Sequence, residues 1–190
     1  MRSGVKWVRE LTDQLDWHWQ NQLRRRFEGL TDEEFLWEPV QGCWSIRPRG
    51  EATSALAGGA GDYVVDWEYP EPQPPPVTTI AWRLGHMAVG VLGARAANHF
   101  GDGGVDYHST RWSPHVADGL ALLDRSYEAW MTGLRTLTEE NLGRPCGPSE
   151  GPYADEPLAG LVLHINREVI HHGAEVALLR DLYRARFALP

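Results

Sequence analysis

A carboxylate and an imidazole lie one helical turn apart in the stretch HINREVIHHGAE, residues 164–175. Glu168 precedes His172 by four residues, a spacing that puts both side chains on one face of an α-helix. The apolar residues on that face are Leu158, Leu161, Ile165, Val169, Val176 and Leu179. Polar groups inside an apolar stripe are costly to bury unless something compensates them. The compensation is expected from the pair itself, from a partner elsewhere or from a metal ion.

A third candidate ligand lies in a separate segment, GHMAVGVLG. With it, His86, Glu168 and His172 would supply two imidazoles and one carboxylate, which suit a divalent ion: zinc first, with nickel or iron(II) as alternatives. Three protein ligands leave a coordination position open for water or a substrate atom, as in catalytic sites. A buried histidine, and an ordinary Glu-His ion pair on a helix, are the simpler interpretations of the same residues.

Four helical segments are expected to position these residues. Apolar periodicity predicts helices over residues 5–28, 79–100, 113–136 and 157–184, with Ser3 and Ser113 as the expected caps of the first and third. Residues 40–77, between the first two, are rich in glycine and proline and are predicted to form a loop or lid. The fold class is therefore all-α: a single domain over residues 1–190, a four-helix bundle with a long crossover between helices 1 and 2.

Two similar motifs support this arrangement. GLTDEEFLWEP and TLTEENLGRP each follow a predicted helix and precede a proline-containing loop. In the first motif, Thr31 followed by Glu34 is a capping-box pattern that predicts a short helical turn. The motifs indicate a weak internal repeat in which each half of the chain forms a helix pair.

Other polar residues near the candidate ligands have both functional and structural interpretations. His164 and Glu175 could orient a ligand or be solvated, and His171 lies at the edge of the apolar stripe. His18, in DWHW on the first helix, could line a pocket, although packing is the simpler role. Arg47, in CWSIR, could reach an anionic substrate or remain an ordinary surface arginine.

The composition excludes several classes of partner. A net charge of −8 argues against binding to nucleic acid or to an anionic membrane. No apolar run is long enough to span a bilayer, and the N-terminus lacks the apolar core of a signal peptide. Two cysteines, Cys43 and Cys146, do not form a disulfide framework. A cytoplasmic protein with reduced thiols is expected.

The order of these elements resembles the DinB-like superfamily of metal-binding four-helix bundles. The motifs that carry the resemblance are GLTDEEFLWEP, CWSIR, GHM and HINREVIHHGAEVALLR. The resemblance implies one ligand from the second helix and two, four residues apart, from the fourth, which are here His86, Glu168 and His172. The glutamate at the second of these positions is similar to the branch that contains mycothiol-dependent maleylpyruvate isomerases and related thiol transferases.

The resemblance implies a metal-dependent enzyme acting on a small molecule, as a transferase or isomerase with a mycothiol-type cellular thiol as co-substrate. The ion would lower the pKa of a thiol or water in its open position. One alternative is a non-catalytic metal- or ligand-binding stress protein of the same fold. Another is a bundle in which Glu168 and His172 form a buried ion pair without metal. Family members often form homodimers, so a homodimer is expected.

Overall fold

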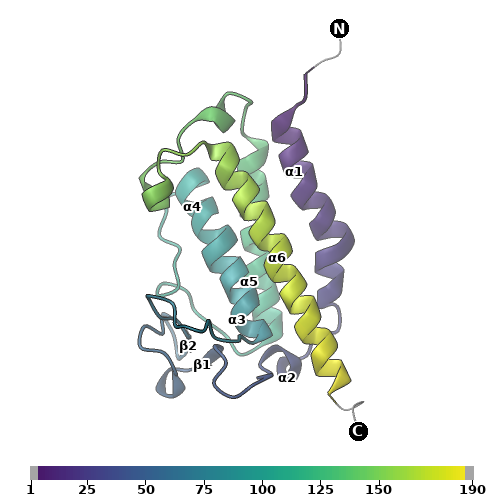
Figure 1. The fold of residues 1–190 in the computed structure, drawn as a ribbon, viewed down its shortest axis with the longest axis vertical. Helices are drawn as coiled ribbons and strands as arrows, with labels where there is room; N and C mark the ends of the chain where they lie inside the picture. The colour runs from purple at the N-terminus through teal and green to yellow at the C-terminus, as the bar shows by residue number, and fades with distance from the viewer. Residues whose placement is uncertain (1–3, 187–190) are drawn as a thin grey trace.

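The protein is a four-helix bundle in a computed structural model that describes residues 4–186 (Figure 1). The first helix begins after Lys6, and Ser3, the expected cap, lies outside the described residues. Among the described residues, no helix is both long enough and apolar enough to cross a membrane. The four helices run side by side and enclose one apolar core.

The first two bundle helices are each made of several segments. The first consists of α1 (Trp7–His18), a π-helical turn η1 (Trp19–Leu23) and a 3-10 turn η2 (Arg24–Phe27). The second consists of α3 (Ile80–Gly85), π-helical turns η4 (His86–Gly93) and α4 (Ala94–Phe100). The third and fourth are the continuous helices α5 (Val116–Arg135) and α6 (Leu158–Ala185). Short helices α2 (Asp32–Phe35), η3 (Arg49–Glu51), η5 (Asn141–Gly143) and η6 (Pro148–Tyr153) lie in the connections.

Contacts between the helices fix their directions. Arg24 pairs with Asp124, and Asp16 pairs with Arg135, so α1 and α5 are antiparallel. Gly133, near the end of α5, lies directly against a ring at the end of α4, so these two helices are parallel. Figure 1 shows both rising from the end of the bundle that carries α2.

These directions correct the predicted connectivity. Residues 36–79, here called the first connection, join two antiparallel helices at one end of the bundle and do not traverse it (Figure 1). Parallel helices need a connection that returns along the bundle. That role belongs to residues 101–115, here called the crossover, between α4 and α5 (Figure 1). The long connection was placed correctly in the sequence, but the crossover lies after the second helix and not before it.

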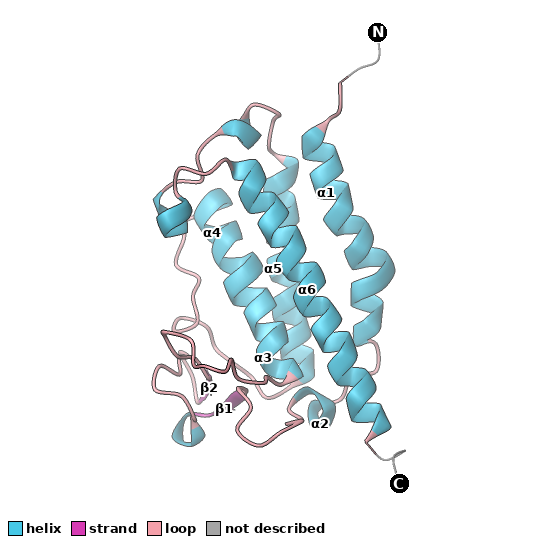
Figure 2. Ribbon diagram, viewed as in Figure 1, coloured by secondary structure: helices cyan, strands magenta, loops and turns pink. Residues whose placement is uncertain are grey.

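The first connection is also more ordered than a loop. It contains an antiparallel pair of short strands, β1 (Ile46–Pro48) and β2 (Tyr63–Val65) (Figure 2). Asp66 is fully buried beside them and accepts hydrogen bonds from the backbone N–H groups of Ser45 and Thr53. Strands of three residues are too short for an alternating pattern to be visible in the sequence, which explains why the prediction missed them.

Side-chain caps start several of the helical turns. Thr31 accepts a hydrogen bond from the Glu34 N–H at 3.2 Å, which confirms the predicted cap and short helical turn, while the Glu34 carboxylate bonds Arg180. In the second copy of the motif, Thr138 accepts from the Asn141 N–H at 3.3 Å. Ser113 is not the cap of α5: the helix begins after His115, and Asp32 accepts from the Val116 N–H. The carboxylate of α2 therefore performs the capping role that the sequence assigned to Ser113.

Aromatic rings connect the first connection to the second bundle helix. Trp44 lies with its ring centroid 5.7 Å from that of Trp82 and 6.1 Å from that of Trp67. The Trp67 ring in turn lies 5.3 Å from that of Tyr107 in the crossover. These four rings, of Trp82, Trp44, Trp67 and Tyr107, are here called the aromatic chain. They pack both connections against α3 near His86.

Candidate metal centre

Glu168 and His172 lie one turn apart on α6, as the sequence predicts. His172 Nε2 is 3.3 Å from Glu168 Oε2. His172 is 7% exposed and Glu168 is half-buried. The pair therefore sits at the boundary between the apolar core and solvent, where a small molecule could reach it.

His86 lies opposite this pair, at the point where α3 passes into the π-helical turns of η4. Its ring centroid is 4.7 Å from that of His172, with the rings nearly perpendicular at 86°. Trp82 stacks on the other face of the His86 ring at 5.1 Å. Among residues 4–186, no hydrogen bond or ion pair joins His86 to Glu168, so the carboxylate's contacts are with α6 itself.

The crossover supplies a partner for His86. The hydroxyl of Tyr107 lies 2.6 Å from His86 Nδ1. Gly90 makes this contact possible, because a Cβ atom there would lie 2.4 Å from the Tyr107 hydroxyl oxygen. A glycine on this helix therefore admits the tyrosine of the crossover.

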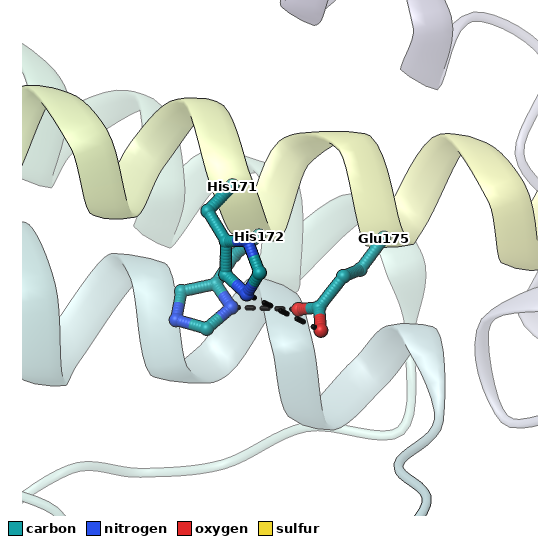
Figure 3. Close-up of side chains that lie close together, drawn as sticks. All are labelled: His171, His172 and Glu175. Carbon is teal, nitrogen blue, oxygen red and sulfur yellow. Dashed lines mark hydrogen bonds and ion pairs between the residues drawn. The ribbon is translucent and has the colours of Figure 1, made fainter.

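His172 has an equivalent partner on its own helix. Its Nδ1 lies 2.7 Å from Glu175 Oε2, and Arg83 Nε holds the same oxygen at 3.0 Å. Figure 3 shows Glu175 and His171 beside His172 on this side of α6. Both imidazoles thus bond through Nδ1 to an oxygen. In metal sites such a bond fixes the ring and leaves Nε2 available as the ligand atom.

Burial and neighbouring charges act on these groups in opposite senses. Burial lowers the pKa of His86 to about 3, and the nearby His172 and Arg83 act in the same direction. For Glu175, burial raises the pKa, but the hydrogen bond from His172 and the charge of Arg83 outweigh it and lower the pKa overall. A neutral His86 at physiological pH retains the lone pair that a metal ligand needs.

A second donor group shares His172. His171, His172 and Glu175 bring one ligand atom each to within 4.8 Å of one another, and this group could hold a metal ion (Figure 3). His171, however, is largely exposed, and the Arg83 guanidinium already occupies a Glu175 oxygen. A cation there would meet like-charge repulsion from Arg83. Among the described residues, this is the one group of three whose ligand atoms lie that close together, and His86, Glu168 and His172 do not form such a group.

The remaining predicted residues lie in different places. His164 Nδ1 is 3.5 Å from Glu168 Oε1 and 2.6 Å from the guanidinium of Arg167, so it adjoins the site. His18 Nδ1 contacts Gln22 on its own helix. Within the described chain, His18 has no hydrogen bond to the candidate ligands.

The Arg47 guanidinium is bonded to other residues of the protein and does not face an open space. Its guanidinium bonds Glu38 at 2.6 Å, Asp66 at 3.0 Å and the Cys43 carbonyl at 2.7 Å. These contacts hold the first connection together. An anionic substrate would have to displace both carboxylates from the guanidinium, so the interaction with substrate suggested by the sequence has no support in the geometry.

The two residues that the sequence prediction missed, Arg83 and Tyr107, were not equally predictable. Arg83 precedes His86 by three residues on a predicted helix, so its position on the same face was available from spacing alone. Tyr107 comes from a Gly/Asp-rich loop 21 residues beyond His86, and no local pattern announces a contact of that kind.

Neither cysteine is an activated thiol. Cys43 is buried and Cys146 is partly buried, and both are free. Burial raises the pKa of the Cys43 thiol. Burial and the charge of Glu150 raise the pKa of the Cys146 thiol. A nucleophilic cysteine needs a lowered pKa, so a thiol nucleophile would have to come from outside the chain.

Comparison with known proteins gives one match. The sequence model of the DinB superfamily matches residues 14–176, which span all four bundle helices. The comparisons found no matching curated protein and no matching solved structure. The match agrees with the helical architecture and includes each of the three candidate ligands.

Proposed function

The chain belongs to the DinB superfamily, and on that premise we propose that it is a metal-dependent enzyme acting on a small molecule. The proposed ligands are His86, Glu168 and His172, and the preferred ion is zinc. The proposed reaction is the transfer of a low-molecular-weight thiol, of the mycothiol type, to an electrophile, or an isomerisation that such a thiol assists.

The observation that carries this proposal is the matched pair of Nδ1 contacts. Tyr107 contacts Nδ1 of His86 and Glu175 contacts Nδ1 of His172 at hydrogen-bond distance. The Nε2 atom of each ring is then available as a ligand atom. Carboxylate–histidine–metal arrangements of this kind are the usual support of a metal-binding histidine.

The side chains of the site have separable roles in this proposal. A bound divalent ion would supply an open position in which a thiol or water becomes acidic enough to act as a nucleophile. Glu175, fixed by Arg83, keeps the proton of His172 on Nδ1. Trp82 and Tyr107 fix the plane of the His86 ring. Burial excludes water from one side of the site and keeps His86 neutral.

The first test is the metal content of purified wild type and four variants, measured by elemental analysis after incubation with zinc and dialysis. We expect about one zinc per wild-type chain and loss of zinc in His86→Ala, Glu168→Gln and His172→Ala. The matched control is His171→Ala, which removes an adjacent histidine that belongs only to the outward donor group. It should retain zinc.

A different pattern of zinc loss would place the ion at the outward donor group. Retention of zinc in His86→Ala with loss in His171→Ala would assign the ion to His171, His172 and Glu175. Absence of zinc from the wild type would leave a bundle with a buried Glu168–His172 pair, and the proposal would be wrong.

The second test is catalysis by zinc-loaded protein. We expect thiol-dependent consumption of an electrophile, such as an epoxide, a bimane or an unsaturated keto acid, which His172→Ala should abolish. Zinc binding without any consumption of these electrophiles would favour the non-catalytic metal-binding protein instead.

A further inference from the structure

A cavity of about 560 Å³ adjoins the candidate metal centre. Its walls are α4, the first half of α6 and the connection over residues 146–156, which covers the end of the bundle (Figure 1). The volume is within the range of small-molecule sites. The metal-centre residues themselves do not line it, so it is a separate space beside them.

His164 and Arg167 link this cavity to the site. Both line the cavity, and both contact Glu168: His164 Nδ1 at 3.5 Å and Arg167 Nε at 3.4 Å from Oε1. The other carboxylate oxygen of Glu168 faces His172. Two side chains therefore lie between the cavity and the proposed ion: His164 or Arg167 of the lining, and then Glu168.

Two guanidinium groups give the cavity its chemical character. Arg95 lies on the α4 wall with its side chain 32% exposed, and Arg167 lies at the rim with its side chain 70% exposed. The Nε atom of Arg95 is buried and has no hydrogen-bond partner among the described residues. Nη1 of the same guanidinium donates to the Gly90 carbonyl, so Nε is the donor left without an acceptor, and a buried donor of this kind is costly.

Two acidic residues, Glu150 and Glu156, line the same cavity, and each arginine already contacts a carboxylate: Arg95 that of Glu150 and Arg167 that of Glu168. Glu150 is almost fully buried and is shared between His99 at 2.9 Å and Arg95 at 3.5 Å. Glu156 is exposed and therefore well screened. His164 bonds the Arg167 guanidinium through Nδ1 at 2.6 Å.

We propose that this cavity binds the substrate of the enzyme and that it takes an organic carboxylate with an apolar body. The carboxylate would lie between Arg95 and Arg167, as charge-assisted hydrogen bonds favour. The apolar part would pack on Leu161 and Pro152. The identification of the ligand as substrate rests on the proposed function, whereas the carboxylate site itself does not.

The test compares two probes that differ only in charge: 4-phenylbutyrate and its neutral amide, 4-phenylbutyramide. Binding to zinc-free and zinc-loaded wild type is measured by isothermal titration calorimetry. We expect the carboxylate to bind at least about tenfold more tightly than the amide. The preference should persist without zinc, because the guanidiniums and not the ion provide it.

Two variants locate the binding. Arg167→Gln removes an exposed guanidinium and should abolish the preference for the carboxylate. Gly160 lines the cavity, so the leucine side chain of Gly160→Leu should block it. The fold should tolerate this change, because a Cβ at Gly160 meets nothing within 4 Å and leucine favours the helix more than glycine does. The matched controls are Arg144→Gln and Gly50→Leu, at exposed positions outside the cavity. Both should bind as the wild type does.

Three results would overturn the inference: equal affinity for the two probes, unchanged binding in Gly160→Leu, or no binding of 4-phenylbutyrate at concentrations up to about 10 mM. Zinc content separates this test from that of the proposed function. A protein that holds zinc but ignores the carboxylate loses only the cavity proposal. A protein that binds the carboxylate but no zinc keeps the carboxylate site and loses the enzyme.

Discussion

At the scale of single residues, hydrogen bonds decide which nitrogen of each imidazole is available. His86 and His172 both bond through Nδ1, one to a phenol and one to a carboxylate. The carboxylate partner is the stronger of the two because it is charged. His172 is therefore expected to be the more electron-rich ligand, and His86 the one whose position depends more on packing against Trp82.

The buried state of His86 predicts a pH dependence of stability. Burial lowers the pKa of His86 to about 3, whereas the unfolded chain binds a proton there below about pH 6.5. Between these values the unfolded state holds more protons, so the free energy of unfolding falls as pH falls. In metal-free protein, His86→Gln should reduce the loss of stability between pH 7 and pH 5 by about 2 kcal/mol. Urea denaturation at both pH values measures this.

The control for this prediction is a histidine shifted the other way. A hydrogen bond to Asp32 raises the pKa of His115. That pair stabilises the protein below about pH 6.5 and loses its contribution as pH rises through the raised pKa. His115→Gln should therefore increase the loss between pH 7 and pH 5, and not reduce it. A change of the same sign in both variants would contradict the assignment of the effect to the burial of His86.

At the scale of elements, the helices were predictable and their irregularities were not. Apolar periodicity located all four bundle helices to within a few residues, because a stripe of buried side chains repeats every turn. Periodicity does not reveal where a turn widens, so the π-helical turns beginning at Trp19 and His86 were predicted as ordinary helix. Such turns often occur at functional positions, and one of them starts at a candidate ligand.

The residues of the candidate site were likewise predictable only where they lie on one helix. Glu168 and His172 were visible as polar residues inside an apolar stripe, and their contact follows from spacing within one helix. The approach of His86 depends on how two helices pack, so the sequence could name His86 as a third candidate ligand but not the geometry of its approach. Tyr107 and Arg95 make contacts between elements, and no local sequence pattern encodes such contacts. For this reason the sequence prediction missed the Tyr107 partner of His86 Nδ1 and the adjoining cavity.

A buried ion pair joins the last turns of α6 to α2. Arg180, 1% exposed, bonds both oxygens of Glu34 and the carbonyls of Arg26 and Glu28. Arg180→Met would leave the Glu34 carboxylate buried and unpaired, so we expect a loss of about 3–5 kcal/mol in the free energy of unfolding. Chemical denaturation measures it.

Two further variants serve as controls for this loss of stability. Arg9→Gln removes an exposed arginine that pairs with Glu10 and should leave stability unchanged within error. The double variant Arg180→Met/Glu34→Leu removes both charges and should recover much of the lost stability, because no uncompensated charge remains. If the single and double variants were equally destabilised, the loss would have to come from packing and not from the buried carboxylate.

At the scale of the whole molecule, the candidate ligands connect segments that are distant in the chain. His86 belongs to the second bundle helix and the other two ligands to the fourth. An ion held by all three would stabilise the packing of both halves together. The predicted single domain should then unfold as one unit, with ion binding acting on the whole equilibrium.

Zinc should therefore raise the temperature of the entire unfolding transition. At a free zinc concentration about 100 times the dissociation constant, the added stability is about 2.7 kcal/mol. Far-UV and near-UV circular dichroism should report the same shifted midpoint in wild type, and His172→Ala should show no shift. Separate midpoints for the two signals would contradict the single cooperative unit.

The aromatic chain has an optical consequence. Trp82 lies nearly parallel to the His86 ring, with an interplanar angle of 12°, and Trp44 and Trp67 follow within 6.1 Å of their neighbours. Indole groups this close exchange excitation, so light absorbed in the first connection reaches the ring beside the candidate ligand. An open-shell ion such as nickel, bound at His86, would quench that emission. The intrinsic fluorescence of the protein would thus report ion binding at the candidate site without any added label.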